Sequence, residues 1–400
     1  MLKGNAVIGQ SGGPTSVINS SLAGVISACR TSPSIRAVYG MQYGIEGLMQ
    51  GRLYDLSAQP DDVIWGLQRT PSSALGSSRY KLKEEDFPAV LEVLKKHDIR
   101  YFFLIGGNDT MDTINKVESW SRSYNYELTG VGIPKTVDND LFGTDHTPGF
   151  PSAAWSNILN VMQAGVLARD MKKVDQFVIY QTIGRDAGWL AAATAMARRD
   201  EDDAPHLIYT PEHVFSTEKF LSDVENCISR YGWVSVVCGE GLKYADGTPV
   251  SSSVVKDKFS NTEFGAMGGS SVAVNLHRMI TEKFGLRGEF QVTESLIMSD
   301  FVRALSTDLR EAFNCGVRAV RLAEEGESGY MVTINRLESS PYKTEYGKVP
   351  LKDVAVAARP MPEEYFNAEK NFVSGEFIKY MKPLTGELPG FVRLKEIMVK

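Results

Sequence analysis

The sequence predicts an α/β protein with two doubly wound lobes, each built around a mainly parallel sheet. Short apolar runs of strand length recur, most are followed by a Gly-rich or polar turn, and a stretch with helical spacing of apolar residues comes next. A chain of 400 residues also exceeds one ordinary hydrophobic core. In sheets of this kind, ligands gather at the carboxyl ends of the strands, so we expect the chemistry there.

The composition argues against several classes of function. Hydrophobic residues make up 43% and charged residues 23% of the chain, as in an ordinary globular protein. The formal net charge of −6 gives no electrostatic footprint for nucleic acid or an anionic membrane. The sequence shows no signal-peptide or membrane-spanning apolar run, and the four cysteines form no CxxC pair. We therefore expect a cytoplasmic enzyme with no nucleic-acid or membrane partner.

The first strand-turn-helix unit lies at the N-terminus, with a buried strand over residues 6–8 and a helix over residues 15–30. Between them, Gly12 and Gly13 allow backbone N–H groups to approach an anion at the positive end of the helix. Tight packing of the helix on the strand explains such glycines equally well. The turn is therefore a candidate anion site.

A second strand is expected over residues 35–39, and a loop of small residues over 74–81 ends in basic and aromatic side chains. Arg79 in this loop could clamp a phosphate, while a solvated surface arginine is the simpler interpretation. An amphipathic helix is expected over residues 87–97.

The continuous apolar run at residues 100–105 is typical of a strand buried in a parallel sheet. It stops at Gly106-Gly107-Asn108-Asp109-Thr110, before a helix that continues to residue 120. A carboxylate at Asp109 disfavours a bulky polyphosphate and leaves room to position a metal ion. A helix N-cap formed by Asn108 or Asp109 is the structural alternative.

The turn richest in chemistry follows the expected strand at residues 130–134. It reads Lys135-Thr136-Val137-Asp138-Asn139-Asp140 and brings a cation, a hydroxyl and two carboxylates together. Such a set can hold a phosphate and a metal ion at once. An ordinary polar strand exit is the alternative, but the other Gly-rich strand ends favour a shared site.

The same alternation continues in the second half, where two further strands end in the acidic residues Glu212 and Glu240. The expected elements are helices over residues 153–170, 216–231, 265–284, 308–325 and 373–381, and strands over 177–180, 206–212 and 234–241.

Taken together, these motifs resemble those of the phosphofructokinase family, in the same order and at comparable spacing. The resemblance covers most of the chain to about residue 240, and the tail over 351–384 is similar to that of longer bacterial pyrophosphate-dependent members. It rests on Gly12-Gly13, Gly106-Gly107-Asn108-Asp109-Thr110, the segment 134–140 and Gly184-Arg185-Asp186-Ala187-Gly188-Trp189.

This resemblance implies a phosphofructokinase-like fold with two Rossmann-like lobes. Residues 1–140 and about 256–310 are expected to form the lobe that binds the phosphate donor. Residues 141–255 and about 311–350 are expected to form the lobe that binds the sugar phosphate. Residues 351–400 are expected to be a C-terminal extension that wraps the body.

The resemblance also implies residue roles, with Asp138 as the general base for the sugar 1-hydroxyl and Lys135, Thr136 and Asp140 as its catalytic partners. The remaining expected site residues are Gly12, Gly13, Gly107, Asp109, Thr110 and Arg79 for the donor, Ile183, Gly184, Arg185 and Glu240 for the acceptor, and Asn108 and Asp109 for Mg²⁺.

Two residues imply pyrophosphate as the donor, because family members that use ATP carry glycine where this chain has Asp109 and Lys135. The Asp109 carboxylate would crowd and repel the α-phosphate of a nucleotide, whereas Lys135 offers a point charge to a small diphosphate. The resemblance therefore implies reversible phosphoryl transfer from pyrophosphate to fructose 6-phosphate, by a homodimer or homotetramer.

Two positions depart from the family pattern. Asn108 stands where a magnesium-binding aspartate is usual, and no Gln-Arg pair for the sugar 6-phosphate is found near Met298. Three explanations stay open: Arg287 or Arg303 reaches in, the acceptor lacks that phosphate, or the chain is a non-catalytic regulatory subunit. We include Arg287 among the candidate substrate-binding residues.

Overall fold

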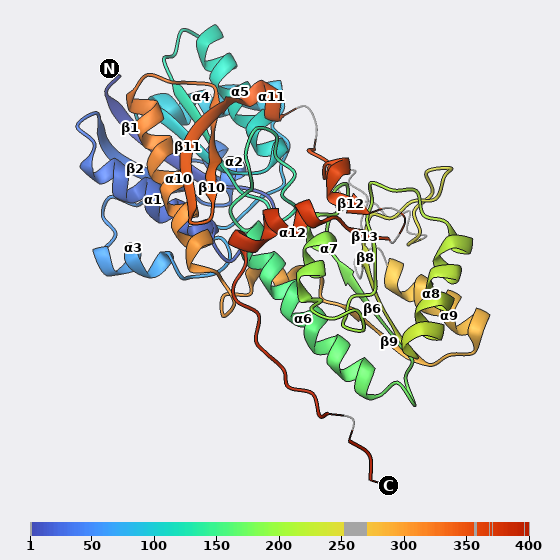
Figure 1. The fold of residues 1–400 in the computed structure, drawn as a ribbon. Helices are drawn as coiled ribbons and strands as arrows, with labels where there is room; N and C mark the ends of the chain where they lie inside the picture. The colour runs from blue at the N-terminus through green and yellow to red at the C-terminus, as the bar shows by residue number, and fades with distance from the viewer. Residues whose placement is uncertain are drawn as a thin grey trace.

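The computed structural model describes residues 2–251, 270–355, 358–367, 369, 371–395 and 397–399. These residues form two α/β lobes, as predicted (Figure 1). The chain builds most of the first lobe, then the second, and returns to the first before it ends on the second. In this described part of the chain, no helix has both the length and the apolar content to cross a membrane.

The first lobe contains a seven-stranded sheet in the order β11-β10-β5-β4-β1-β2-β3. The central pairs are parallel, and β3 and β11 pair antiparallel at the two edges. The strands are β1 (Gly4–Gln10), β2 (Ile35–Met41), β3 (Leu53–Asp55), β4 (Ile99–Gly106), β5 (Thr129–Pro134), β10 (Tyr330–Ser339) and β11 (Tyr342–Pro350).

Strand β4 is buried from Tyr101 to Gly106 because helices cover both faces of the sheet. Tyr101 and Phe103 pack in one hydrophobic cluster, and Phe102 and Leu104 pack in another on the opposite face. This two-sided burial is the arrangement that a doubly wound sheet requires. The first cluster includes α1 (Ile18–Thr31), α3 (Asp61–Leu67) and α10 (Ser306–Glu324), and the second includes α2 (Gly44–Met49), α4 (Phe87–Lys96), α5 (Asn108–Ser123) and α11 (Leu351–Val354).

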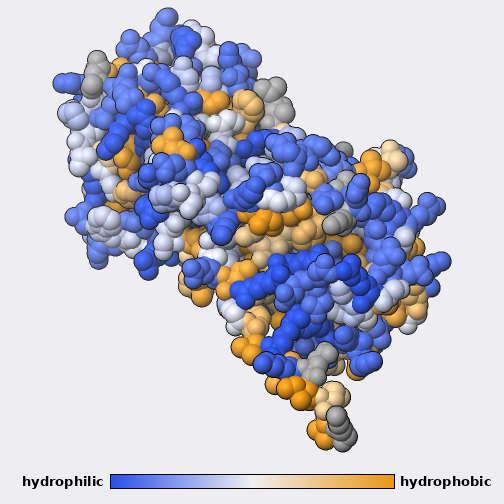
Figure 2. Space-filling model, viewed as in Figure 1, coloured by the Kyte–Doolittle hydropathy of each residue, from blue (hydrophilic) through white to orange (hydrophobic). Residues whose placement is uncertain are grey.

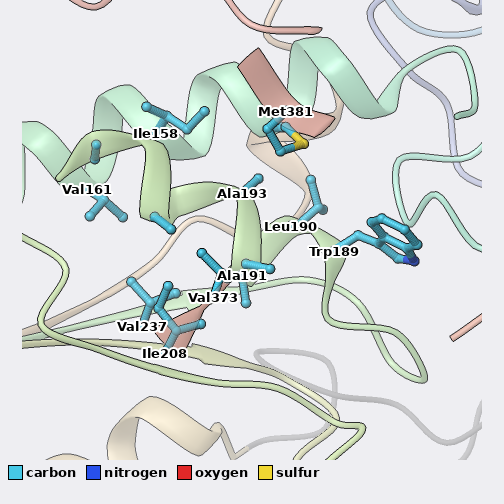
Figure 3. Packing of buried hydrophobic residues seen from close by; sticks show 14 of the residues in the cluster. Ile158, Val161, Trp189, Leu190, Ala191, Ala193, Ile208, Val237, Val373 and Met381 are labelled. Atoms are coloured by element: carbon cyan, nitrogen blue, oxygen red, sulfur yellow. The ribbon is translucent and has the colours of Figure 1, made fainter. Parts of the chain in front are cut away.

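The second lobe has a four-stranded parallel sheet in the order β7-β8-β6-β9. On one face, Ile158 and Val161 pack with Leu190, Ile208 and Val237 (Figure 3). The elements are β6 (Phe177–Thr182), β7 (Leu207–Tyr209), β8 (Val234–Gly239) and β9 (Gly288–Val292), with α6 (Phe150–Asp170), α7 (Trp189–Ala193) and the 3₁₀ helix η2 (Thr194–Ala197) on one face, and α8 (Thr217–Tyr231) and α9 (Val272–Phe284) on the other.

The C-terminal extension passes from the first lobe to the second. α11 packs on α5, and α12 (Gly375–Met381) buries Phe377 and Met381 in the core of the second lobe. The last residues leave the body, and Figure 2 shows apolar side chains along this tail, where Val392 and Leu394 are almost fully exposed. The shorter elements are η1 (Glu84–Asp86), η3 (Glu294–Ser299), η4 (Glu363–Tyr365), β12 (Phe366–Asn367), β13 (Phe372–Val373) and η6 (Lys382–Leu384).

The lobe boundaries predicted from the sequence are wrong in two places. Residues 272–292 were expected in the first lobe but belong to the second, because β9 pairs with β6. Residues 311–350 were expected in the second lobe but belong to the first, because α10 packs on α1 and β10 pairs with β5. The segment 256–269 of the predicted donor lobe lies outside the described residues.

Candidate active site

Most of the predicted site residues follow the carboxyl ends of parallel strands in both lobes. Gly12 and Gly13 follow β1, Asn108 follows β4, and residues 135–140, here named the β5 turn, follow β5. In the second lobe, residues 183–188, here named the acceptor turn, follow β6, and Glu240 follows β8. The two groups lie close enough together for the charges of Arg185 and Glu240 to shift the pKa of Asp138.

Lys135 is a buried cation held against the first glycine turn. Its ammonium group donates a hydrogen bond to the Gly13 carbonyl at 2.8 Å, and only 4% of the residue is exposed. Gly12 has φ of 75°, and a Cβ atom at this position would lie 3.2 Å from Lys135 Nζ. A glycine there therefore admits both the left-handed backbone and the lysine. Burial lowers the pKa of Lys135 to about 8. The charges of Asp138 and Asp140 oppose this shift, and the charge of Arg79 adds to it.

The β5 turn is fixed by hydrogen bonds on both sides of Asp138. The Asp138 amide donates to Thr136 Oγ1 at 3.1 Å. Asn139 is buried in the left-handed region with φ of 56°, and its side chain donates to Tyr380 Oη at 3.1 Å and accepts from the Thr147 amide at 3.0 Å. Asparagine tolerates this conformation better than most residues. The turn therefore holds Asp138 and Asp140 in a defined place.

The two carboxylates of the β5 turn have perturbed acidity. Burial, followed by the charges of Asp140 and Glu240, raises the pKa of Asp138 to about 7, against the opposing effect of Lys135 and Arg185. Burial also raises the pKa of Asp140, opposed by hydrogen bonding to its own backbone and by Lys135. A carboxylate that titrates near neutral pH is suited to general base catalysis.

The turn after β4 presents Asn108 and Asp109 differently. Asn108 is the first residue of α5, and its Oδ1 is buried without a hydrogen-bond partner among the described residues. The Asp109 side chain is 81% exposed and pairs with Lys81 at 3.6 Å. Thr110 is buried against Gly106, where no side chain fits because a Cβ atom would lie 2.1 Å from the Thr110 hydroxyl. Of the two predicted metal ligands, Asn108 thus has the oxygen that lacks a partner.

The acceptor turn is tied to the strand ends beside it. The Gly184 amide donates to Glu240 Oε1 at 3.3 Å, and the Gly188 amide donates to Glu212 Oε1 at 2.8 Å. Burial raises the pKa of Glu240, with further contributions from Glu294 and Asp186 and opposition from Gly184 and Arg185. The turn therefore carries an arginine beside a carboxylate that can accept further hydrogen bonds. Ile183, at its start, is half-buried.

An apolar side chain occupies the region where the family resemblance implies an arginine. Ile297 is buried in the core of the second lobe, and Met298 packs partly against the same cluster. The Met298 Cε methyl lies 2.5 Å from the position of a Cβ atom at Gly13. The thioether therefore reaches the first glycine turn and brings no positive charge.

Arg287 is not part of this cluster, so its prediction as a substrate-binding residue is wrong for this chain. It precedes β9 at the opposite end of the parallel sheet, where its side chain is 76% exposed and pairs with Asp175 at 2.8 Å. Strand direction explains the error, since residues before and after a strand lie at opposite edges. Arg303 is half-buried and donates to Asn160 Oδ1 at 2.6 Å.

Sequence reasoning missed the polar residues that support the site from the C-terminal extension, above all Arg359. Its guanidinium donates to the carbonyl of Asn139 at 2.9 Å, and its backbone amide donates to the carbonyl of Asp140 at 2.6 Å. The proline-rich sequence around Arg359 contains no local pattern that predicts such contacts. Only the three-dimensional arrangement brings Arg359 to the β5 turn.

Paired α/β lobes with a lysine, two carboxylates and glycine turns at the strand ends define an enzyme of the phosphoryl-transfer class. The sequence matches the family described as Phosphofructokinase over residues 5–322. The chain belongs to the phosphofructokinase family, whose enzymes generally use a divalent metal ion.

Three individual proteins place the chain within this family. A Rhodospirillum rubrum protein named pyrophosphate–fructose 6-phosphate 1-phosphotransferase is 37% identical over 99% of this chain and 98% of its own length. A sulfofructose kinase from Alkalicoccus urumqiensis is 32% identical over 91% of this chain and 92% of its own length. The crystal structure of a pyrophosphate-dependent phosphofructokinase from Marinobacter aquaeolei is similar with a TM-score of 0.86 and 34% identity, covering 98% of this chain and 94% of that one.

Proposed function

We propose that this chain transfers a phosphoryl group from pyrophosphate to the 1-hydroxyl of fructose 6-phosphate, giving fructose 1,6-bisphosphate and phosphate. The observation that carries this proposal is the buried ammonium of Lys135, which lies at the Gly12-Gly13 turn beside the carboxylates of the β5 turn. The names of the full-length relatives agree with this donor and acceptor. An intact set of this kind favours catalysis over a silent regulatory subunit.

In the proposed mechanism, Asp138 takes the proton of the sugar 1-hydroxyl as its oxygen forms a bond to phosphorus. The bond to the bridging oxygen of pyrophosphate breaks, and inorganic phosphate leaves. Lys135, Thr136 and the backbone amide of Gly13 stabilise charge on the transferring group, which is the main requirement of phosphoryl transfer, while the Gly12 amide donates to the Ser78 carbonyl at 3.2 Å and holds the turn. Asp140 assists the base.

The remaining predicted residues position the two substrates. Ile183, Gly184, Arg185 and Glu240 hold the acceptor in this proposal. Arg185 and Glu240 lie close enough to Asp138 for their charges to shift its pKa, and the Gly184 amide donates to Glu240 Oε1. Gly107, Asp109, Thr110 and Arg79 face the donor, and Arg79 lies close enough to Lys135 to lower its pKa. The donor and acceptor groups therefore approach the β5 turn from opposite lobes.

We propose Mg²⁺ as the metal ion. The unpartnered Asn108 Oδ1 and the Asp140 carboxylate are oxygen ligands of the kind that Mg²⁺ uses, together with substrate phosphates. No cluster of three or more His, Cys, Asp or Glu side chains suited to a metal occurs among the described residues. When bound, Mg²⁺ would neutralise negative charge on the diphosphate.

Substitutions at Asn108 and Asp109 show which of these two predicted ligands binds the metal ion. Chelation with EDTA should abolish turnover, and Mg²⁺ should restore it. Asn108→Asp adds a charge to the site and should lower the Mg²⁺ concentration for half-maximal rate several-fold. Asp109→Asn is the matched comparison and should leave that concentration unchanged. The opposite pattern would assign the metal to Asp109.

The donor assignment is tested by the double change Asp109→Gly with Lys135→Gly. Loss of Lys135 should reduce turnover with pyrophosphate by about 10²–10³-fold. Removal of the Asp109 carboxylate should at the same time improve use of ATP relative to pyrophosphate. Rates with both donors give the ratio, and an unchanged ratio would contradict this donor argument.

The proposed reaction is tested by measuring fructose 1,6-bisphosphate production by the purified protein with Mg²⁺ and fructose 6-phosphate. We expect turnover with pyrophosphate and little with ATP. Absence of product with both donors would overturn the proposal.

A second candidate acceptor is a sugar that carries a different group at carbon 6, and Met298 favours it. A thioether stands where the family pattern has a phosphate-binding arginine, and Glu294 adds negative charge near Glu240. One relative of similar length is named for sulfofructose. Comparing kcat/KM for fructose 6-phosphate and 6-deoxy-6-sulfofructose distinguishes the two acceptors.

We further propose a cytoplasmic homodimer or homotetramer. All four cysteines are free thiols, which suits a reducing compartment. Leu296, Phe301 and Val302 are exposed apolar residues near η3 and could be covered by a second copy. Light scattering at micromolar protein concentration measures the assembly state, and a monomer would contradict the oligomer.

A further inference from the structure

Arg359 binds the main chain of the β5 turn and of the residues that follow it. Besides its contacts with Asn139 and Asp140, it donates to the carbonyl of Thr144 at 2.5 Å and to that of Asp145 at 3.3 Å. These carbonyls belong to the segment that carries Asp138 and leads from the first lobe to the second. One arginine of the C-terminal extension thus binds the main chain at both ends of the segment 139–145, which directly follows the proposed base.

The same arginine is held by the second lobe. Its guanidinium lies 4.8 Å from the ring centroid of Trp189, whose indole donates to the Arg359 carbonyl at 3.5 Å. Trp189 is buried and begins α7, directly after the acceptor turn (Figure 3). Two residues further on, the Met361 amide donates to Glu212 Oε1, the same oxygen that binds Gly188. The segment 359–361 therefore links the β5 turn to the acceptor turn.

The Arg359 guanidinium is enclosed between these partners. Main-chain carbonyls of the segment 139–145 accept its hydrogen bonds, the Trp189 ring lies beside it, and its Nε is buried without a hydrogen-bond partner among the described residues.

We infer that Arg359 is a positioning residue, which holds the carboxylates of the β5 turn in register with the acceptor turn across the two lobes. This inference rests on the proposed function for its kinetic consequence and on the contacts of Arg359 for its structural one. Displacement of a reacting group by about 1 Å can cost around 10²-fold in rate. Anchoring by a guanidinium that binds several carbonyls at once is therefore large enough to matter for turnover.

The kinetic test compares Arg359→Gln, Arg359→Lys and Arg393→Gln. Arg359→Gln should lower kcat roughly 10- to 100-fold with little change in KM for pyrophosphate. Arg359→Lys keeps the charge but forms fewer hydrogen bonds, so it should recover part of the kcat lost in Arg359→Gln. Arg393→Gln removes a surface arginine paired with Asp202 and should match the parent.

A second measurement does not depend on the reaction. Hydrogen exchange followed by mass spectrometry should show faster exchange in Arg359→Gln at residues 136–147 and 184–189, and not in Arg393→Gln. If the parent protein fails to turn over any acceptor, the proposed function fails while this exchange pattern still decides the role of Arg359. Unchanged exchange in both segments, or a lower melting temperature with unchanged kcat, would overturn the inference.

Discussion

Asp138→Asn should lower kcat by about 10²–10⁴-fold, the usual contribution of a positioned general base. The amide keeps the shape of the carboxylate but cannot take the proton of the sugar hydroxyl. The acid limb of the parent pH profile should lie near the raised pKa of Asp138, about 7, because the base works only when ionised. The residual activity of the variant should lack that limb.

Stability separates this expectation from simple misfolding. A carboxyl group whose pKa is higher in the folded than in the unfolded state makes folding less favourable as pH rises through that interval. Asp138 therefore destabilises the folded protein at neutral pH, and Asp138→Asn should melt at an equal or higher temperature. Asp112→Asn, which removes a surface carboxylate paired with Lys116, is the control and should keep full activity. Full activity of Asp138→Asn would show that Asp138 is not the general base.

The parts of the fold that follow from local pattern were predictable from the sequence. The apolar run of β4 and the glycine turn after it are adjacent in the chain, so one segment carries both signals. The same holds for β5 and its turn, where Lys135 and Asp138 follow the strand directly. Because parallel strands end at the same edge of a sheet, these turns can be placed together without knowing which distant segments contact each other.

Pairings between distant segments were not predictable in this way. β10 joins the first sheet beside β5, with Tyr330 opposite Val131, although about 200 residues separate them. α10 is amphipathic by pattern, but the pattern does not say that its apolar face packs on α1. The incorrect lobe boundaries and the error at Arg287 both follow from this limit. Arg359 was missed for the same reason, since its partners lie on another lobe.

Lys135→Met should reduce kcat with pyrophosphate by about 10²–10³-fold, the effect of removing one well-placed donor to a developing charge. Methionine fills a similar volume but cannot donate to the transferring phosphate or to the Gly13 carbonyl. Burial already disfavours the ammonium, so its replacement by an apolar side chain should not lower the melting temperature greatly. Lys116→Met, on the exposed face of α5, is the matched control and should remain active.

The alkaline limb of the pH profile gives the more specific test of Lys135. Its pKa is lowered to about 8, so the lysine loses its proton, and with it the charge that stabilises the phosphoryl group, as the pH rises through that value. The parent enzyme should therefore be most active between the limb of Asp138 and that of Lys135, and Lys135→Met should lose only the alkaline one. Persistence of that limb in the variant would mean that another group titrates there. Full activity of Lys135→Met would show that the buried ammonium is not the feature that selects pyrophosphate.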